Sequence, residues 1–563
     1  MYIRTIRSKG NEYIQLAHNY RDPKSGASRA QVLYHFGRKD QLDLDALRRL
    51  VQSISRFLEP SEVEAIQRDL DLDFPFEFLG SRQLGGSALL DGLWERLRIK
   101  HTLMDLLEQR AYETPIERLL FAMVANRALS PSSKLHMEHW IREEAYIAEL
   151  PQVEVHTLYR AMDFLLEASE EIQREVFFTV ADLFNLEVDL LFLDTTTTYF
   201  EIEGEDEDLE IDGLTLEEGL RKRGMESKDS RPDLAQVVIA FAVTRTGIPV
   251  RCWVWPGNTV DQKIVEDVKR DLNDWKLGRV VMVEDTGFNS AKNRRILQGA
   301  GGHYIIGEKM RLGSKGAPAE ALQRGGRYQE MENGLRFKEV IVGGDSEARR
   351  RFVVVHNPVE AERDRTKRAD IVAEIERRLA GLKELDGSPH EKAACALRSH
   401  PVFGRYVRQT KTGKLRLNKA KLSDEARLDG KYLVSTSDDG LAAEDVVLGY
   451  KQLAVIERVF RDMKHLIDIR PVRHRLPERI RAHVLLCWLA MLMVRIAENE
   501  TNQTWFQMKK ALATLQVGIH RTRSGEVWQT NPISAENKEI FEKLHVPLPP
   551  RYVSLPVPQK VLA

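Results

Sequence analysis

Cysteine is scarce in this chain, with three among 563 residues. Cys252, Cys395 and Cys487 lie far apart and form no Cys-x-x-Cys pair. A disulfide framework is therefore excluded, the spacing argues against a structural zinc site, and a reducing compartment is favoured. The first residues, MYIRTIRSKG, lack the apolar core of a signal peptide, so we expect a cytoplasmic protein.

Several motifs of familiar enzyme classes are also missing. The chain has no GxxxxGK motif followed by Ser or Thr, which argues against a P-loop and for a reaction without a nucleotide cofactor. It has no GxGxxG after a predicted strand, no HExxH and no GxSxG. An α/β enzyme that acts on small molecules therefore lacks any recognisable cofactor motif.

No sign of charge dominates, because 84 Lys and Arg residues balance 85 Asp and Glu residues. This balance neither supports nor excludes a nucleic acid partner, so the local distribution of charge matters more. The longest apolar run, residues 482–497, contains His483 and Arg495 and is shorter than the roughly 20 residues that span a bilayer. We expect a buried helix there and no membrane partner.

Residues 1–80 are predicted to form a small basic β-domain and a linker. The predicted strands are 2–7, 12–19 and 30–36, with a turn signal at 22–26. Residues 1–40 contain eight Lys or Arg and three Asp or Glu, so this domain either contacts DNA phosphates or is a solvated hairpin with a biased surface. Residues 81–187 have apolar residues spaced three to four apart, which predicts a helical region. Because helical bundles ahead of catalytic cores often bind DNA, we expect this region to do so.

The pattern changes to a mixed α/β core in residues 188–310, continued by 441–500. Strands are predicted at 188–193, 234–244, 250–255, 279–283 and 303–306, with helices at 261–275 and 291–298. This order predicts a mixed sheet that begins with an antiparallel meander. Between the first two strands, residues 201–218 contain ten Asp or Glu and no Lys or Arg, which favours a solvated loop over a metal site.

Residues 311–440 form a separate segment, followed after the core by a C-terminal helical region and a proline-rich tail in 501–563. The segment contains a predicted strand at 351–355, a charged helix at about 359–385 and a basic run at 403–421 with seven Lys or Arg and no acid. Arg405, Arg408 and Lys411 in this run are candidate DNA contacts, and Tyr406 is a candidate for stacking on bases. A surface hairpin without a partner is the equal alternative.

Two carboxylates stand where predicted strands end. Asp194 follows the first strand of the core, and Asp285 follows the fourth. A strand end can hold a carboxylate rigidly toward a cleft, and two such groups form an oxygen-only site that suits Mg²⁺. Each residue alone is more often a cap or turn former, so the pair carries the prediction.

Glu457 is the third candidate, on a helix predicted over 446–468. At 100° per residue, Tyr450, Glu457 and Lys464 line up within about 40°, beside an apolar stripe. Arg461 lies near them, so cations that suit phosphate flank the carboxylate. An ordinary Glu–Arg surface pair is the alternative.

Together these stretches resemble the DDE transposases of bacterial insertion sequences, which have a ribonuclease H-like catalytic core. The motifs are FLDTTTTYF, VEDTGFNSAKN and YKQLAVIERVFRDMKHL. The last resembles the signature Y-x2-R-x3-E-x6-K, with Leu453 at the Arg position; Lys451 or Arg461 are candidates to replace that Arg. SKDSRPDLAQVV and PGNTVD are similar to the same group. The 172 residues from Asp285 to Glu457 leave room for the mostly β insertion domain of these transposases, here 311–440.

The resemblance implies a DNA transposase that cuts insertion-sequence ends and joins the 3′-OH to target DNA by two-metal phosphoryl transfer. Asp194 would bridge two Mg²⁺ ions, with Asp285 holding one and Glu457 the other, and Mn²⁺ is expected to substitute. Double-stranded DNA, as terminal inverted repeats and target, is the implied partner, bound by a homodimer. A metal-dependent nuclease without strand transfer and a catalytically silent transposase-derived DNA-binding protein are the alternatives.

Overall fold

The computed structural model describes residues 1–8, 10–21, 28–43, 77–108, 110, 115–183, 190–202, 204–211, 214–224, 227–229, 231–274, 280–311, 316–343, 349–522 and 525–555. The chain separates into two compact units. One unit comprises residues 1–79, 520–527 and 556–563, and the other comprises 80–519 and 528–555.

The smaller unit contains the three antiparallel strands that the sequence predicts. They are β1 (Tyr2–Ser8), β2 (Asn11–Arg21) and β3 (Ser28–Arg38), in the order β1-β2-β3, followed by the short 3₁₀ helix η1 (Lys39–Gln41). The predicted turn at 22–26 lies outside the described residues. Arg7 and Lys39 both pair with Glu12, at 3.0 and 2.8 Å, so part of the basic charge is neutralised within this unit.

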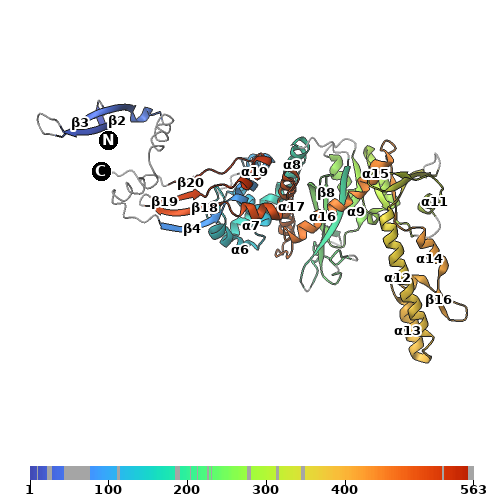
Figure 1. Ribbon diagram of the computed structural model, residues 1–563. Helices are drawn as coiled ribbons and strands as arrows, with labels where there is room; N and C mark the ends of the chain where they lie inside the picture. The colour runs from blue at the N-terminus through green and yellow to red at the C-terminus, as the bar shows by residue number, and fades with distance from the viewer. Residues whose placement is uncertain are drawn as a thin grey trace. The chain divides into compact units, whose positions relative to one another are not determined.

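The centre of the larger unit is a nine-stranded sheet (Figure 1). Its order is β12-β13-β14-β17-β11-β10-β5-β8-β9. The predicted strands of the core appear as β5 (Leu190–Tyr199), β8 (Gln236–Val243), β9 (Pro249–Pro256), β10 (Val281–Glu284) and β11 (His303–Glu308). The antiparallel meander β5-β8-β9 is confirmed, and β5, β10 and β11 run parallel. Helices α9 (Asp261–Asp274) and α10 (Ala291–Gln298) occupy the predicted positions, with η4 (Thr286–Phe288) and η5 (Gly299–Gly301) beside α10.

The acidic stretch 201–218 contains a small hairpin and is not an unpaired loop. Its strands are β6 (Leu209–Ile211) and β7 (Leu214–Glu217). Asp206 accepts from the guanidinium of Arg221, and Asp208 pairs with Lys222 at 2.8 Å. Basic residues that follow the acidic run therefore neutralise part of it, which the count within 201–218 could not show.

The predicted helical region is confirmed. Its helices are α3 (Gly85–Arg96), α4 (Ile99–Glu108), α5 (Ile116–Leu129), α6 (Lys134–His139), the π-helix η3 (Trp140–Glu144), α7 (Val155–Glu167) and α8 (Ser169–Leu183). Helix α5 is buried along its whole length up to Ala128, and α5 and α7 pack against α17 (Pro477–Thr501). The region therefore shares one hydrophobic core with the sheet.

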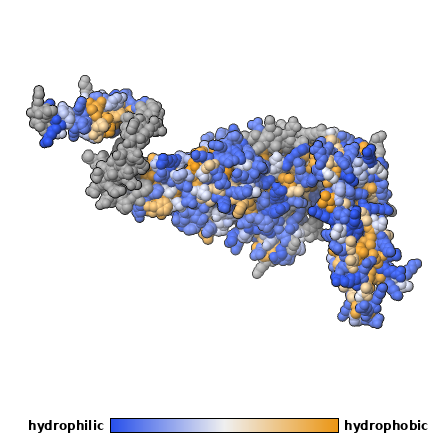
Figure 2. Space-filling view, viewed as in Figure 1, coloured by the Kyte–Doolittle hydropathy of each residue, from blue (hydrophilic) through white to orange (hydrophobic). Residues whose placement is uncertain are grey.

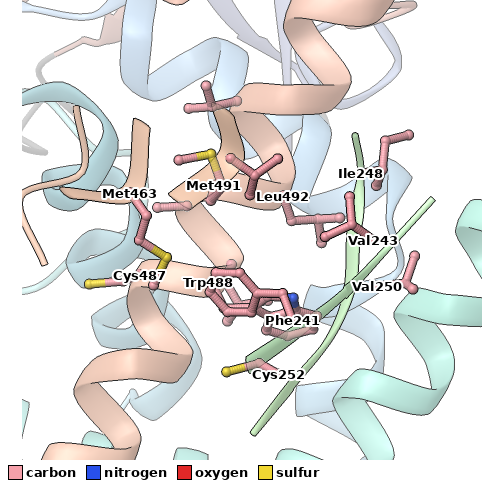
Figure 3. Close-up of a cluster of buried hydrophobic side chains, with 14 of the residues drawn as sticks. Phe241, Val243, Ile248, Val250, Cys252, Met463, Cys487, Trp488, Met491 and Leu492 are labelled. Atoms are coloured by element: carbon pink, nitrogen blue, oxygen red, sulfur yellow. The ribbon is translucent and has the colours of Figure 1, made fainter. Parts of the chain in front are cut away.

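Helix α17 contains the long apolar run. By length and composition it could cross a membrane, but 94% of its apolar window is buried inside the protein. Figure 3 shows its Trp488 and Leu492 against β8 and β9, and the Trp488 indole donates to the carbonyl of Pro249 at 2.8 Å. The predicted buried helix is thus confirmed, and the visible surface of the molecule is mostly hydrophilic (Figure 2).

The expectation of a mostly β segment at 311–440 is wrong. Its elements are α11 (Ala317–Gln323), β12 (Gln329–Glu330), β13 (Arg336–Val342), β14 (Arg350–His356), α12 (Pro358–Leu382), α13 (Gly387–Ser399), η6 (Gly404–Tyr406), β15 (Val407–Gln409), β16 (Leu415–Leu417), α14 (Lys419–Ala426) and β17 (Lys431–Thr436). The charged helix α12 alone has 25 residues, supported by pairs such as Arg378–Glu374. Helices α12 and α13 pack together over a small core of their own (Figure 1). Strands β12, β13, β14 and β17 extend the central sheet.

The C-terminal region contains strands as well as the expected helices. Its helices are α18 (Trp505–Leu512) and α19 (Ala535–Lys543). Strands β18 (Gln516–Thr522), β19 (Gly525–Thr530) and β20 (Tyr552–Ser554) form a sheet with β4 (Glu77–Gln83), in the order β20-β19-β18-β4. The purely helical expectation is therefore wrong, since the alternating short strands were missed.

Candidate active site

Asp194 and Asp285 come directly after paired residues of two neighbouring parallel strands. The register pairs Leu193 of β5 with Glu284 of β10, so the two aspartates are the next residues on each strand. Neighbouring strands lie about 4.8 Å apart, which brings the two carboxylates to one edge. The sequence predicted this meeting from the strand ends alone.

Asp194 does not end its strand, contrary to the prediction. Strand β5 continues through Tyr199 because Thr195 to Tyr199 pair with β8, from Ala240 back to Gln236. On its other side β5 loses its partner after Leu193, where β10 ends. Asp194 therefore stands where one neighbour stops while the other continues, which holds its backbone rigidly.

The Asp194 carboxylate is largely buried, with 16% of its side chain exposed. The backbone N–H of Thr195 donates to its Oδ1 at 2.7 Å, and Lys228 Nζ lies 3.4 Å from the same oxygen. Burial raises the pKa of Asp194, the negative charge of Asp285 raises it further, and Lys228 and the Thr195 N–H counteract this. A cation at this carboxylate would therefore relieve an unfavourable charge.

Tyr450 donates a hydrogen bond from its hydroxyl to Asp285 Oδ1 at 3.3 Å. Its ring stacks on Tyr432 of β17, with centroids 5.7 Å apart. Burial and the neighbouring charge of Asp285 raise the pKa of Tyr450, so the phenol stays protonated and remains a donor. Gly307 of β11 leaves space for this ring, since a Cβ there would stand 2.2 Å from the Tyr450 hydroxyl.

The predicted continuous helix at 446–468 is two helices. Helix α15 (Ala443–Lys451) ends and α16 (Leu453–His465) begins at Gln452, whose ψ of −8° interrupts the regular hydrogen bonding. Tyr450 therefore lies on a different helix from Glu457 and Lys464, and the single-helix alignment of the three was wrong in detail. The predicted apolar stripe is confirmed, since Ile456, Val459, Phe460 and Met463 are buried and Ile467 beyond the helix is too.

All three predicted carboxylates line one cavity of about 510 Å³. Phe460 anchors α16 over the sheet by stacking on Phe241 of β8, with centroids 5.1 Å apart. Glu457 is exposed on the cavity side of that helix. Across the described residues, no three His, Cys, Asp or Glu side chains stand close enough together to form a metal site as they are.

The donor chemistry of the cavity fits a hard divalent cation. Its candidate ligands are carboxylate oxygens, and the repulsion between Asp194 and Asp285 would be relieved by positive charge. Lys228 already supplies one such charge, 3.4 Å from Asp194. Asp194, Asp285 and Glu457 are therefore the candidate oxygen ligands of this cavity for a divalent cation.

Two site residues were missed, although their stretch SKDSRPDLAQVV was singled out. Lys228 contacts Asp194, as above. The next residue, Asp229, has 7% of its side chain exposed and accepts from Lys464 at 2.7 Å and from Arg470 at 3.1 Å. The adjacent opposite charges of Lys228 and Asp229 are the only sequence signal of these roles. They do not indicate which residues each side chain contacts.

The four predicted DNA contacts near Glu457 differ in their positions. Tyr450, Arg461 and Lys464 line the cavity, and Lys464 is paired with Asp229. Lys451 is exposed but is not among the cavity-lining residues. Leu453, at the Arg position of the signature, lines the cavity, so Arg461 is the better placed replacement for that Arg.

The basic run lies on the hairpin β15–β16 and its flanks. Arg405, Arg408 and Lys411 are exposed. Tyr406 is 6% exposed and belongs to the core between α12 and α13, so the idea that it stacks on bases is wrong. The guanidinium of Arg405 lies over the Tyr406 ring, 5.4 Å from its centroid.

Two protein families match this chain. Residues 221–493 match the transposase DDE domain, and residues 3–65 match the N-terminal domain of IS1634 family transposases. No curated protein matches the chain significantly. Among solved structures, the chain is similar to the piggyBac transposase in a cryo-EM structure of its synaptic complex with hairpin DNA, at 10% identity over 76% of this chain and 79% of that chain. The TM-score is 0.34, too low to carry an argument.

The two matches, at residues 3–65 and 221–493, define a transposase with a DDE domain. The chain belongs to the DDE transposases of insertion sequences, and its N-terminal domain is similar to that of the IS1634 family. Asp285 and Glu457 lie within the matched DDE range, whereas Asp194 precedes it. The resemblance stated from the sequence is confirmed at the level of the family.

Proposed function

We propose that this transposase cleaves the ends of its insertion sequence and joins the released 3′-OH to target DNA. The observation that supports this most is the single cavity lined by Asp194, Asp285 and Glu457. Three carboxylates from two adjacent strands and one helix are suited to phosphoryl transfer, which requires charge neutralisation and positioning. The order of the first five core strands, β9-β8-β5-β10-β11, supports the ribonuclease H-like assignment.

The three carboxylates would hold Mg²⁺, and we expect Mn²⁺ to substitute. Bound divalent ions would neutralise the phosphate and activate the attacking oxygen. Tyr450 would keep the Asp285 carboxylate oriented through its hydrogen bond. Arg461, exposed at the cavity, would bind a phosphate of the DNA end, and Lys228 would balance the charge of Asp194.

The reaction has two displacements at phosphorus. In the first, water attacks a phosphodiester at the element end and gives its proton to solvent or a carboxylate, while the P–O3′ bond breaks and the departing 3′-oxygen takes up a proton to become a 3′-OH. In the second, that 3′-OH loses its proton and attacks a target phosphodiester, and the displaced target 3′-oxygen is protonated in turn. Neither step needs a nucleotide or a protein nucleophile.

We further propose that the protein works in the cytoplasm as a homodimer on double-stranded DNA, because two element ends must be joined in one reaction. The exposed residues Arg405, Arg408 and Lys411, together with the basic N-terminal strands and the helical region, are candidate DNA contacts. A silent DNA-binding descendant is the less favoured alternative, since all three carboxylates line the cavity. A nuclease without strand transfer has the same site.

The test uses the DNA that flanks the gene. Both flanks are placed around a marker, and excision and insertion with Mg²⁺ are compared between the parent protein and Asp285→Asn. Excision and joining by the parent alone support the proposal, whereas cleavage without joining supports the nuclease. End binding without cleavage by either protein would support the silent DNA-binding alternative.

A further inference from the structure

A second polar cavity, of about 300 Å³, lies in the larger unit between α5, α6 and the segment before α17. Arg127 near the end of α5 and Lys134 at the start of α6 line it, together with Asp468, His474 and His483. Both Arg127 and Lys134 are 5% exposed, and His483 is 3% exposed. Charged residues almost never reach such burial without a partner of opposite charge.

The positive charge in this cavity is not balanced. No hydrogen bond or ion pair is present for the Lys134 ammonium group among the described residues. Arg127 donates to the carbonyls of Ser132 and Asp468, and its buried Nε has no partner. The Nδ1 of His483 is also buried without a partner. Asp468 is the only carboxylate among the lining residues.

Burying these cations together is unfavourable, and the pKa values of Lys134 and His474 show it. Burial and, to a smaller extent, the charge of Arg127 together lower the pKa of Lys134 to about 7. Burial and the nearby cations Lys134, Arg479 and Arg127 lower the pKa of His474 to about 4. Buried donors and cations that outnumber the one lining carboxylate, Asp468, are suited to an anion that binds from outside.

We propose that this cavity binds a phosphate group of the DNA backbone. Continuity with the catalytic cavity favours DNA over free phosphate. Arg470 and Arg473 line both this cavity and a neighbouring one of about 710 Å³. Lys464 lines that neighbouring cavity and also the catalytic one.

The neighbouring cavity is rich in cations. Arg470, Arg473 and Arg475 line it beside Tyr199, together with the carboxylate of Glu201. A strand whose scissile phosphate lies at Asp194 and Asp285 would therefore pass Lys464 and Arg470, which share the carboxylate of Asp229, before it reaches Lys134. The inference rests on the proposed function, because the strand is the substrate of that site.

The test compares the full-length parent with Lys134→Met, which keeps the length of the side chain and removes the charge. Affinity for an end duplex is measured from about 50 to 200 mM salt. We expect a loss of about tenfold in affinity at the lower salt, and a decrease of about one in the slope of log K against log salt, since one phosphate contact is lost. Lys543→Met, which removes an exposed lysine of α19 paired with Glu539, is the control and should leave both values unchanged.

A thermal unfolding measurement separates a binding role from a structural one. Removing an unpaired buried charge should raise the Tm of Lys134→Met, whereas loss of a structural contact would lower it. A variant that matches the parent in affinity and salt slope would overturn the proposal. A second result would also overturn it. If inorganic phosphate raises the Tm of the parent but not that of Lys134→Met, and the two proteins bind DNA equally well, the site takes free phosphate.

Failure of this inference is distinguishable from failure of the proposed function. A parent that binds ends but never cleaves them contradicts the proposed function, while the difference in slope between parent and Lys134→Met still measures the phosphate site. A parent that cleaves and joins DNA, with an unchanged slope in the variant, contradicts the phosphate site alone.

Discussion

The hydroxyl of Tyr450 donates to Oδ1 of Asp285 at 3.3 Å, although the two residues are 165 positions apart in the chain. The bond joins α15 to the end of β10, and the segment 311–440 lies between them in sequence. Strand β17, the last element of that segment, supplies the Tyr432 ring on which Tyr450 stacks. This aromatic pair thus adds to the pairing of β17 with β11, which already joins the insertion to the central sheet.

Tyr450→Phe should slow DNA cleavage by about 10- to 100-fold, the effect of losing a hydrogen bond to a charged group worth about 1.5–3 kcal/mol. The Asp285 carboxylate would lose the donor that orients it, while the ring stacking would remain. The single-turnover cleavage rate with Mg²⁺ is the measurement, alongside Tm. A rate equal to that of the parent would show that the hydroxyl does not position Asp285.

Tyr432→Phe is the matched control for that change. The Tyr432 hydroxyl is buried and has no hydrogen-bond partner in the part of the chain that the structure describes. Its removal should leave cleavage unchanged and should stabilise the protein by about 1 kcal/mol, because the group costs desolvation without compensation. An equal loss of activity in both variants would indicate a general requirement for the aromatic pair.

Asp194→Asn should raise Tm in the absence of metal. The pKa of Asp194 is raised by burial and by Asp285, so the ionised form destabilises the folded state at neutral pH. The protonated form of Asp194 stabilises the folded state. This stabilisation is present below the pKa of the unfolded chain and is lost as pH rises through the pKa of the folded protein. Added Mg²⁺ should raise the Tm of the parent and should not raise that of Asp194→Asn. At a Mg²⁺ concentration of 100 times the dissociation constant, the free energy of unfolding of the parent should increase by about 2.7 kcal/mol. Equal responses would remove Asp194 from the metal site.

Lys464→Ala should weaken end binding and lower the salt slope by about one if Lys464 contacts phosphate. The structure adds a second role, since Lys464 is paired with the largely buried Asp229 at 2.7 Å. Lys464→Arg keeps the charge and is expected to restore most of the slope. An unchanged slope in Lys464→Ala, with reduced Tm, would leave Lys464 as a structural partner of Asp229 alone.

The core strands and both aspartates were predictable because a short apolar run precedes each aspartate, although β5 continues past Asp194 to Tyr199. The break at Gln452 was not, since a near-zero ψ at one residue leaves the apolar period of α15 and α16 almost intact. The pairings of Lys228 and Asp229 were out of reach for another reason. They depend on how a loop folds back across the sheet, and charge order along the chain does not specify partners.

Replacing Arg408 and Lys411 together by Ala should weaken DNA binding without changing Tm. Both side chains are exposed on or beside the hairpin β15–β16, away from the buried core that contains Tyr406. We expect the salt slope to fall by about two, because two phosphate contacts would be lost. A double variant of Arg363 and Arg365 on α12, exposed and paired with Glu360 and Glu362, serves as control. Identical salt slopes in the hairpin variant and the parent would show that the basic run is a solvated hairpin that does not contact DNA phosphates.

The stability of the parent relative to Lys134→Met should increase as pH rises from 7 to 10. Lys134 has a folded pKa of about 7, against an ordinary value of 10.5, so between these values the unfolded chain binds more protons than the folded one. The free energy of unfolding then rises with pH, by at most about 1.4 kcal/mol per pH unit for one group. Below pH 7 both states are protonated, and the buried charge, facing Arg127, His474 and His483, has its full cost. Chemical denaturation at several pH values gives the free energy of unfolding of both proteins. The titration of the groups that they share cancels in the difference between the two. A difference that stays constant from pH 7 to 10 would mean that Lys134 keeps its ordinary pKa and that its ammonium group is already compensated.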